Sequence, residues 1–306
     1  MDYNKSPATP SAIIAFMLLA LLKTMRPRQW VKNAFVFTAL VFDGKLFIPE
    51  YFVFTLAAFG LLCLLASTVY IVNDLADIEK DRQHPAKRNR PLAAGALSKN
   101  VAILAAILFI LIALGGGFRL GFYFGALALL YFILNLLYSF WLKHVVILDV
   151  LIVSAGFVIR VASGTVLFHV ERFSPWLYVG MSLLSLFLIL GKRRHEINLL
   201  QGDAEDHRAV LANYNLDLLD HMIGIVTTSA IVAYSFYTFT AENLPQNHTM
   251  MLTIPFVLYG IFRYLYLIHV RHQGGAPDEL LFKDRPLLMA VGLWSLTVIL
   301  LLYFIK

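Results

Sequence analysis

The chain has 306 residues, a length that would allow two soluble domains, but its composition excludes such an arrangement. Hydrophobic residues make up 59% and charged residues only 14%, and the mean hydropathy is +0.73. Because long apolar runs recur throughout, the sequence predicts an all-α polytopic membrane protein. The net charge of +6 does not indicate binding to nucleic acid, since no basic stripe is interleaved with aromatic residues.

The first segment is a polar tail over 1–10, followed by the apolar stretch Ser11–Leu22. This stretch is too short to span a bilayer comfortably. The residues after it also lack the small-residue pattern of a signal-peptide cleavage site. We therefore predict an N-terminal tail with a short interfacial or re-entrant helix over 1–25, and a single transmembrane domain over 26–306.

Nine membrane-spanning helices are predicted from the apolar runs of that domain. They cover about 27–42, 51–77, 99–115, 120–141, 145–167, 174–198, 216–240, 248–270 and 286–305. When the segment Lys80–Lys99 is placed in the cytoplasm, most of the 25 Lys and Arg residues fall on that side. The positive-inside rule then predicts that the amino terminus and the polar clusters face the cytoplasm.

The first polar cluster, Met25–Asn33, opens the first predicted span. Its residues Gln29, Lys32 and Asn33 extend a polar face a full turn into an otherwise apolar helix. Polar groups at membrane depth are costly, so we expect these three to line a water-filled cavity. Arg28 is better explained as a positive anchor at the membrane surface.

The stretch Asn73–Ser98 concentrates charge directly after a hydrophobic run. On a helix, Asp74, Asp77 and Asp81 fall at i, i+3 and i+7, so their carboxylates share one face, and Asn73 reaches the same rim. Clustered carboxylates repel one another unless a cation lies among them. Oxygen ligands suit Mg²⁺, which bridges to substrate phosphates. We therefore predict a Mg²⁺ site on these residues.

Basic residues follow the acids at once. Lys87, Arg88 and Arg90 lie between Pro85 and Pro91, which favour extended or turning backbone. Acids that bind a metal, next to bases that bind free phosphate oxygens, provide the chemistry of a diphosphate site. The alternative is a solvated loop of mixed charge between two membrane helices.

Later polar residues fall on the same predicted side of the membrane. Asn135, Tyr138 and Lys143 form a set at the end of the fourth span, where Tyr138 is equally well explained as an interfacial aromatic. Asp149 lies near the start of the fifth span. Arg160 lies deeper, where an arginine needs an acidic or phosphate partner or must extend to the far interface. For Arg160 we favour a structural pair over a role in substrate binding.

The second polar cluster, Gly191–Asp206, follows the sixth span at a position equivalent to that of the first acidic stretch. Lys192 and Glu196 stand at i and i+4 and face the same way. Two interpretations stay open with equal weight. In one, the bases satisfy the C-terminal dipole of a helix; in the other, they bind phosphate.

One ordered motif links these clusters to a known family. N-D-x-x-D-x-x-x-D at Asn73–Asp81, followed by H-P-x-K-x-x-R-P-x-A-x-G, resembles the first acidic motif of the UbiA-type intramembrane prenyltransferases. Those enzymes ordinarily carry a second D-x-x-x-D motif, whereas this chain has G-K-R-x-x-E at Gly191–Glu196.

Three further motifs narrow the resemblance to one branch of the superfamily. They are R-P-R-Q-W-V-K-N from Arg26, Y-S-x-x-L-K-x-x-x-x-L-D at Tyr138–Asp149, and G-F-x-x-R at Gly156–Arg160. With the altered second motif, they resemble the decaprenyl-phosphate phosphoribosyltransferases. The resemblance covers nearly the whole chain from Arg26 onwards.

The resemblance implies a UbiA-like bundle of nine transmembrane helices in the inner (plasma) membrane, with a polar cavity facing the cytoplasm. It implies transfer of phosphoribose from 5-phosphoribosyl 1-diphosphate to a polyprenyl (decaprenyl-like) phosphate, with Mg²⁺-assisted release of diphosphate. Asp74 and Asp77 would be catalytic, and Asn73 and Asp81 would complete the metal set. The substrate phosphates would be bound by Arg26, Gln29, Lys32, Lys87, Arg90, Tyr138, Lys143, Lys192, Arg193 and Glu196. The expected partners are the two substrates and the bilayer, and an oligomer stays open.

Two alternatives compete with this function. A prenyltransferase that moves a polyprenyl group from its diphosphate to an aromatic or tetrapyrrole acceptor would use the same first motif, and the missing second D-x-x-x-D argues against it. A transporter or channel would carry broken helices or paired charges in mid-membrane. Here the charge gathers at one rim, which disfavours that class.

Overall fold

The computed structural model describes residues 10–85, 87–168, 174–199, 209–242, 244–245, 247–275 and 277–305. Within these ranges the chain is helical and contains no strand. The longer helices are α3 (Pro49–Ala76), α5 (Lys99–Leu120), α6 (Phe122–Phe140), α7 (Leu148–Thr165), α8 (Pro175–Leu199), α9 (Leu216–Thr240), α10 (Ile254–His269) and α12 (Arg285–Tyr303). The shorter ones, with η for a 3-10 helix, are α1 (Pro10–Met25), η1 (Pro27–Phe37), α2 (Thr38–Phe42), α4 (Ile78–Gln83), η2 (Leu142–His144), η4 (Ala209–Asn213), η5 (Thr249–Thr253) and α11 (Pro277–Lys283).

Eight helices among the described residues are long and apolar enough to cross a membrane, with η5 and α10 counted as one run. They correspond to eight of the predicted spans, and the all-helical membrane class is confirmed. The remaining predicted span, 27–42, is η1 followed by the five-residue α2. Polar residues such as Gln29 and Lys32 interrupt the apolar run there, so no membrane-length α-helix forms. The count of nine is therefore not confirmed.

Several helices begin where a polar side chain caps the backbone. The Ser98 side chain accepts a hydrogen bond from the Val101 amide at the start of α5, and that of Asn215 accepts from Leu218 at the start of α9. Such caps satisfy backbone N–H groups that have no partner inside the helix. α7 begins at Leu148, later than predicted, because Ile147 has a left-handed φ of 69° that interrupts the helical path.

Two compact units can be distinguished by their internal contacts: Met1–Asn33 with Phe59–Phe132, and Ala34–Ala58 with Ile133–Lys306. All three boundaries between the units fall inside a continuous helix: η1, α3 or α6. The single transmembrane domain over 26–306 therefore stays a prediction.

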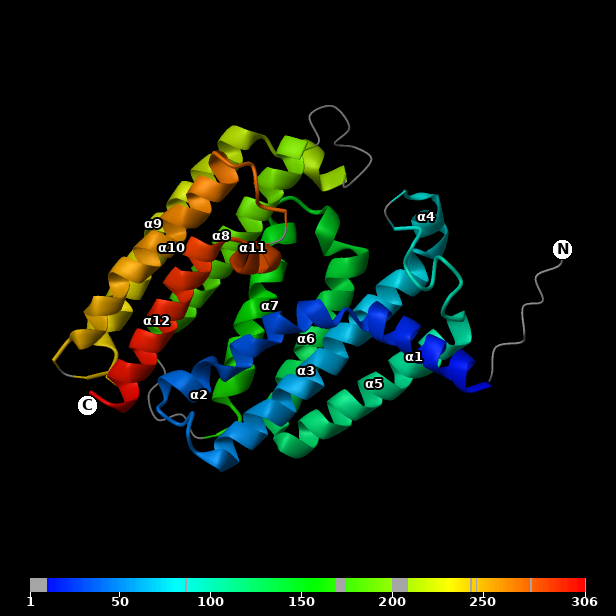
Figure 1. The fold of residues 1–306 in the computed structure, drawn as a ribbon, viewed down its shortest axis with the longest axis horizontal. Helices are drawn as coiled ribbons and strands as arrows, with labels where there is room; N and C mark the ends of the chain where they lie inside the picture. Colours follow the sequence, from blue (N-terminus) through cyan, green and yellow to red (C-terminus); the bar gives the residue numbers. More distant parts are fainter. Residues whose placement is uncertain are drawn as a thin grey trace. The chain divides into compact units, whose positions relative to one another are not determined.

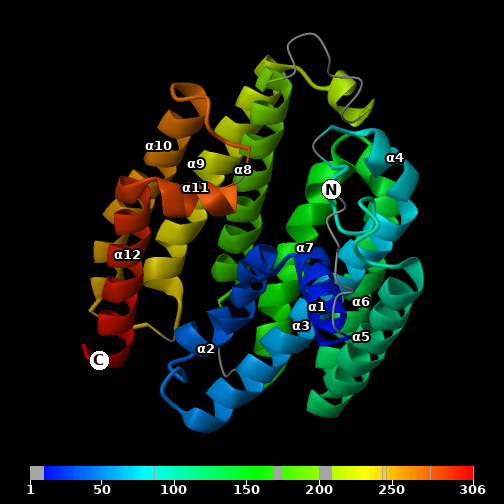
Figure 2. The same ribbon diagram turned by 45° about the vertical axis from the view of Figure 1, so that its right-hand side comes forward.

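The first unit has a small core formed by the C-terminal half of α3 together with α1, α4, α5 and the segment that precedes α5. Its buried members are Ala20, Ile71, Ile78, Leu92, Leu97, Ala102 and Ala106. α4 is a separate short helix that follows α3 (Figure 2). At the α5–α6 turn, a Cβ on Gly125 would lie 2.4 Å from the Phe118 ring, so glycine permits the close approach of the two helices. This packing fixes the end of α3 that carries the acidic motif.

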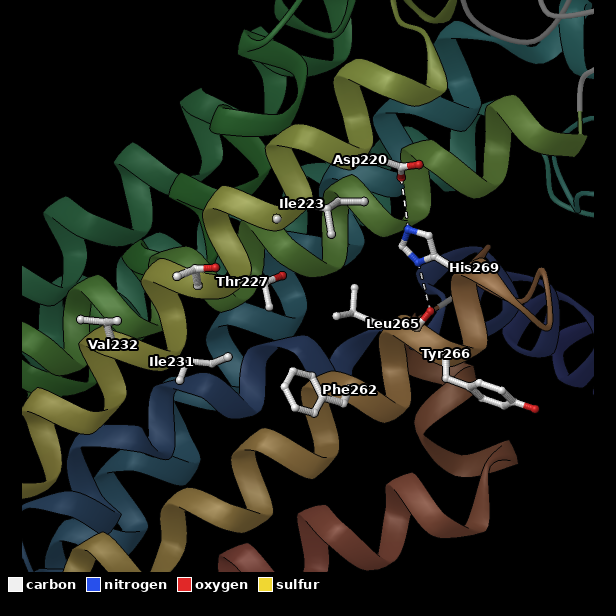
Figure 3. Close-up of a pocket in the computed structure, with 11 residues that line it drawn as sticks. Asp220, Ile223, Thr227, Ile231, Val232, Phe262, Leu265, Tyr266 and His269 are labelled. Atoms are coloured by element: carbon white, nitrogen blue, oxygen red, sulfur yellow. Dashed lines mark hydrogen bonds and ion pairs between the residues drawn. The ribbon is translucent and has the colours of Figure 1, made fainter.

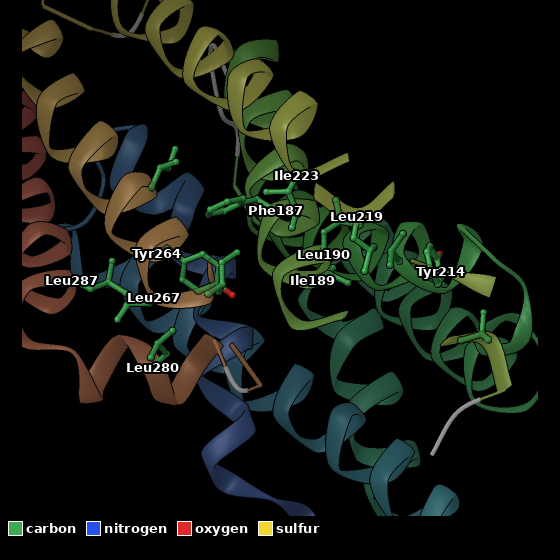
Figure 4. Packing of buried hydrophobic residues seen from close by; sticks show 14 residues of the cluster. Phe187, Ile189, Leu190, Tyr214, Leu219, Ile223, Tyr264, Leu267, Leu280 and Leu287 are labelled. Carbon is green, nitrogen blue, oxygen red and sulfur yellow. The ribbon is translucent and has the colours of Figure 1, made fainter. Parts of the chain in front are cut away.

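The second unit packs α7 and α9 against α8 and α12 against α10. Figure 1 shows α9, α10 and α12 running alongside one another. Its main core joins these helices around Phe187 and Tyr264, whose rings meet edge to face with centroids 5.0 Å apart (Figure 4). A Cβ on Gly191 would lie 2.9 Å from the Tyr264 ring, so glycine lets α10 close on α8. The core thereby holds the C-terminal part of α8, which carries the second polar cluster.

Candidate functional site

The acidic motif forms an ion-pair cluster within the first unit. Asp74 is 2% exposed, and its Oδ1 accepts from Arg26 Nη2 at 2.6 Å and from Arg90 Nη1 at 3.1 Å. The same Arg90 nitrogen donates to Oδ2 of the buried Asp81 at 2.7 Å. Arg90 therefore bridges two buried carboxylates. The cation that clustered acids require is supplied here by the chain itself.

The predicted helical face of the acids is nearly continuous. α3 ends at Ala76 and α4 begins at Ile78, but the Asp77 amide still donates to Asn73 O at 3.0 Å and the Asp81 amide to Asp77 O at 2.8 Å. The i→i−4 bonds thus pass through the bend at Asp77, whose φ is −100°. As a result Asp74 and Asp81 reach the same arginine, while Asp77 and Asn73 are half-buried.

The oxygen-only set of Asn73, Asp74, Asp77 and Asp81 has the chemistry that Mg²⁺ prefers, and all four residues lie along the junction of α3 and α4. Among the described residues, no three His, Cys, Asp or Glu side chains come together as a metal cluster. The set fits a divalent metal by donor type. Its use as a ligand set stays a prediction.

Arg26 stands between α1 and η1 with φ of 55°, a left-handed conformation that is uncommon outside glycine. Its guanidinium carbon lies 4.7 Å from the centroid of the Tyr70 ring, so a cation–π contact adds to the pair with Asp74. The sequence placed Arg26 in the site only through the family motif. The structure places it against the Asp74 carboxylate, which the resemblance predicts to be catalytic.

The other predicted residues of this unit differ in their surroundings. Lys32 Nζ donates to Gln29 Oε1 at 2.5 Å, and Lys87 is half-buried in the turn after α4. Asn33 is fully buried, and its amide donates to the Cys63 sulfur at 3.2 Å. The expectation that Asn33 lines a water-filled cavity is therefore wrong, because its side chain is satisfied inside the protein.

The second polar cluster forms a network within the second unit, centred on Arg193. This side chain is 3% exposed, and its Nε donates to Asp149 Oδ2 at 2.9 Å. Nη1 donates to Glu196 Oε2 at 2.7 Å, and Nη2 donates to the Tyr138 hydroxyl at 3.3 Å. α6, α7 and α8 thus each contribute at least one member. The groups that accept from Arg193 in this network are side chains, not the carbonyl groups at the end of α8.

Lys192 and Lys143 differ from Arg193 in their access to solvent. The Lys192 side chain is 42% exposed, and its Nζ lies 3.9 Å from Glu196 Oε1. Lys143 lies in η2 and is half-buried. These amines are the accessible cations of the set, whereas Arg193 is enclosed by its partners. Asp203 and Asp206, the acids further along the cluster, lie outside the described residues.

Tyr214 belongs to the same network, although the sequence analysis did not select it. Its hydroxyl donates to Asp149 Oδ1 at 2.7 Å and accepts from the Ile147 amide at 2.7 Å. Burial, together with the bond to Asp149, raises the pKa of Tyr214 to about 12. No periodic pattern could single this residue out, since its role depends on a partner in another helix.

A separate cavity of about 690 Å³ lies in the second unit, between α9 and α10 (Figure 3). Its wall is largely apolar and includes Ile231 and Phe262. At one end, Asp220 accepts from Arg194 Nε at 2.6 Å and lies 3.2 Å from His269 Nε2. None of the predicted phosphate-binding or metal-binding residues lines this cavity.

Comparison with known proteins decides the family. The sequence model of the UbiA prenyltransferase family matches residues 33–283. The chain belongs to this family. With eight membrane-length apolar helices, it is a multi-pass membrane protein.

Two relatives within the UbiA family match nearly the whole chain. The decaprenyl-phosphate phosphoribosyltransferase of Corynebacterium glutamicum is 32% identical over 293 residues, which cover 92% of this chain and 86% of that protein. The enzyme of the same name from Mycolicibacterium smegmatis is 32% identical over 301 residues, which cover 94% of each chain.

A solved structure shares the fold. A UbiA homologue from Archaeoglobus fulgidus, bound to GPP and Mg²⁺, matches with a TM-score of 0.69 and covers 92% of this chain and 99% of its own. At 17% sequence identity this likeness establishes the fold alone. The UbiA fold predicted from the motifs is thus confirmed.

Proposed function

We propose that this UbiA family member transfers phosphoribose from 5-phosphoribosyl 1-diphosphate to a polyprenyl phosphate. The observation that carries the proposal is the second polar cluster, which is built from Lys192, Arg193 and Glu196 where the family ordinarily carries two aspartates. A phosphorylated sugar donor brings a phosphate group that a prenyl diphosphate lacks, and cations suit it. The names of the relatives that match over nearly the whole chain support the same reaction.

The acidic motif would bind the leaving group. Asn73, Asp74, Asp77 and Asp81 would hold Mg²⁺, which when bound neutralises charge on diphosphate as it departs. The guanidinium groups of Arg26 and Arg90 fix the positions of the buried carboxylates, and half-buried Asp77 is the most accessible of the three acids. The Mg²⁺ bound by the Archaeoglobus homologue supports a divalent metal in a protein of this fold.

The transfer itself needs little acid–base chemistry. An oxygen of the lipid phosphate forms the new bond to C1 of the ribose, while the bond from C1 to the diphosphate oxygen breaks and diphosphate leaves with the electron pair. A phosphate monoester is already anionic at neutral pH, so no strong general base is required. Lys87, Lys143 and Lys192 would bind phosphate oxygens, and apolar helices would hold the isoprenoid tail.

The active face would lie in the cytoplasm, at the inner membrane. The excess of Lys and Arg in the polar clusters supports this orientation. In a Cys63→Ala background, a cysteine at Gln83 should be labelled from the cytoplasmic side only. Cysteines at Gln201 and Gln246, which lie outside the described residues, should be labelled from the cytoplasm and from outside, respectively. Labelling of Gln83 and Gln246 from the same side would refute the nine-span arrangement.

The function is tested by offering both kinds of donor to the purified protein in lipid vesicles with Mg²⁺. Ribose-labelled 5-phosphoribosyl 1-diphosphate should transfer its label to polyprenyl phosphate, with one diphosphate released per ribose. A labelled prenyl diphosphate with an aromatic acceptor should give no product. Prenyl transfer to the ring, without ribose transfer, would instead establish the alternative activity.

A further inference from the structure

We propose that Tyr214 is a positioning residue for phosphate binding. Its hydroxyl holds two segments in place at once: the α6–α7 connection, which carries Lys143, and the Asp149–Arg193 pair, which supports Glu196 and Lys192. The proposal rests on the proposed function, because these bases are taken to bind the phosphates of the donor.

The two hydrogen bonds of Tyr214 have a defined direction. The phenol has one proton, which it donates to Asp149 Oδ1 at 2.7 Å, and its oxygen accepts the Ile147 N–H at 2.7 Å. The Tyr214 side chain is itself buried, being 6% exposed. The raised pKa of Tyr214, about 12, keeps the proton in place at physiological pH. Packing requires only the aromatic ring, so the two hydrogen bonds of the hydroxyl have a separate role.

The first task concerns the α6–α7 connection. Ile147 is β-branched and has a φ of 69°, a conformation that is strained for such a residue. The bond from its N–H to Tyr214 ties this strained point to the segment before α9. η2, which contains Lys143, also packs against η4, which ends directly before Tyr214. Removing the hydroxyl should therefore loosen the connection that places Lys143.

The second task passes through Asp149. Asp149 is fully buried, with Oδ1 on Tyr214 and Oδ2 on Arg193 Nε. The other nitrogens of Arg193 hold Glu196 and Tyr138, and Glu196 lies beside Lys192. Without the Tyr214 proton, the buried Asp149 oxygen loses a donor and the carboxylate is free to turn. Arg193 and Glu196 would move with it, and Lys192 would lose its fixed neighbour.

Tyr214→Phe tests the proposal because it removes the hydroxyl and keeps the ring. We expect the KM for 5-phosphoribosyl 1-diphosphate to rise about tenfold, as for the loss of one well-placed polar contact. The KM for polyprenyl phosphate and kcat should change less than twofold. In a double-mutant cycle, the effects of Asp149→Asn and Tyr214→Phe on the donor KM should be less than additive, because Tyr214 acts in part through Asp149.

Tyr234→Phe is the matched control. The Tyr234 hydroxyl also makes two hydrogen bonds, to Thr253 Oγ1 at 2.6 Å and from Trp294 Nε1 at 2.7 Å. Tyr234 lies roughly 27 Å from the start of α9 at Leu216, at 1.5 Å per residue. Both variants should lower the thermal unfolding temperature by similar amounts, but only Tyr214→Phe should raise the donor KM. An unchanged donor KM in Tyr214→Phe, or an equal rise in both variants, would overturn the proposal.

Failure of the proposed function would be visible separately. In that case the wild-type protein would not transfer phosphoribose. Calorimetric titration with 5-phosphoribosyl 1-diphosphate would then compare its Kd for the wild type and for Tyr214→Phe. A Kd about tenfold weaker in the variant would support the positioning role. Equal values, or no binding to either protein, would refute it.

Discussion

Replacement of Arg90 by alanine should destabilise the protein more than any other loss of a surface-accessible charge in the acidic cluster. One Arg90 nitrogen lies 2.7 Å from Asp81 and 3.1 Å from Asp74, and both acids are almost fully buried. Removing one partner of a buried pair typically costs about 3–5 kcal/mol. Because Arg90 is 29% exposed, water screens part of the interaction, so we expect the lower end, about 3 kcal/mol.

The loss of Arg90 should leave the two acids with different numbers of partners. Asp74 keeps Arg26 at 2.6 Å, whereas Asp81 loses its pair with Arg90. Adding Asp81→Asn to Arg90→Ala removes the uncompensated charge and should recover about 1–2 kcal/mol. If these carboxylates bind Mg²⁺, the metal should also raise the unfolding temperature of Arg90→Ala more than that of the wild type.

The assay is thermal or denaturant unfolding of purified protein in one detergent, with and without Mg²⁺. Arg82→Ala is the control, since the pair of Arg82 with Glu79 is exposed and should contribute no more than about 1 kcal/mol. Wild-type stability for Arg90→Ala, or no recovery in the double variant, would show that Arg90 does not balance these acids.

Three further predictions concern single side chains. Asp77→Ala should abolish turnover while the protein stays folded, because Asp77 is half-buried; a near-normal rate at saturating Mg²⁺ would contradict the metal assignment. Lys192→Ala should raise the donor KM roughly ten- to a hundredfold, whereas Lys283→Ala, a lysine with its own glutamate one turn away, should leave it unchanged. The hydrogen bond from Arg263 lowers the pKa of Asp284. The ionised Asp284 therefore stabilises the folded protein above its unfolded pKa of about 3.9, and this stabilisation is lost as pH falls through the folded pKa. The wild type should therefore lose its stability advantage over Asp284→Asn below about pH 4; a constant difference down to pH 2 would refute this.

The positions of the membrane helices follow from the sequence because apolar run length and capping are local properties. α8 and α9 lie within about two residues of their predicted ranges, and Asn215 caps α9 at its start. The shared face of Asp74 and Asp81 could also be predicted from local spacing, because i→i−4 hydrogen bonds continue through Asp77. The family and its chemistry were likewise predictable from ordered motifs. The 27–42 span was not, because polar residues within that run favour a 3-10 path over one α-helix.

Only the tertiary structure decided which charges meet. The Asp149–Arg193 pair joins residues 44 positions apart, and Arg26 reaches Asp74 across 48. Such pairs depend on how helices pack, and a pattern along the chain carries no information about that packing. The burial of Arg193 could not be predicted for the same reason. A base near the end of a helix is expected to be exposed to solvent, whereas residues of α6 and α7 enclose Arg193. Tyr214 had no signal in the sequence, because its role exists only where Ile147 and Asp149 converge on its hydroxyl.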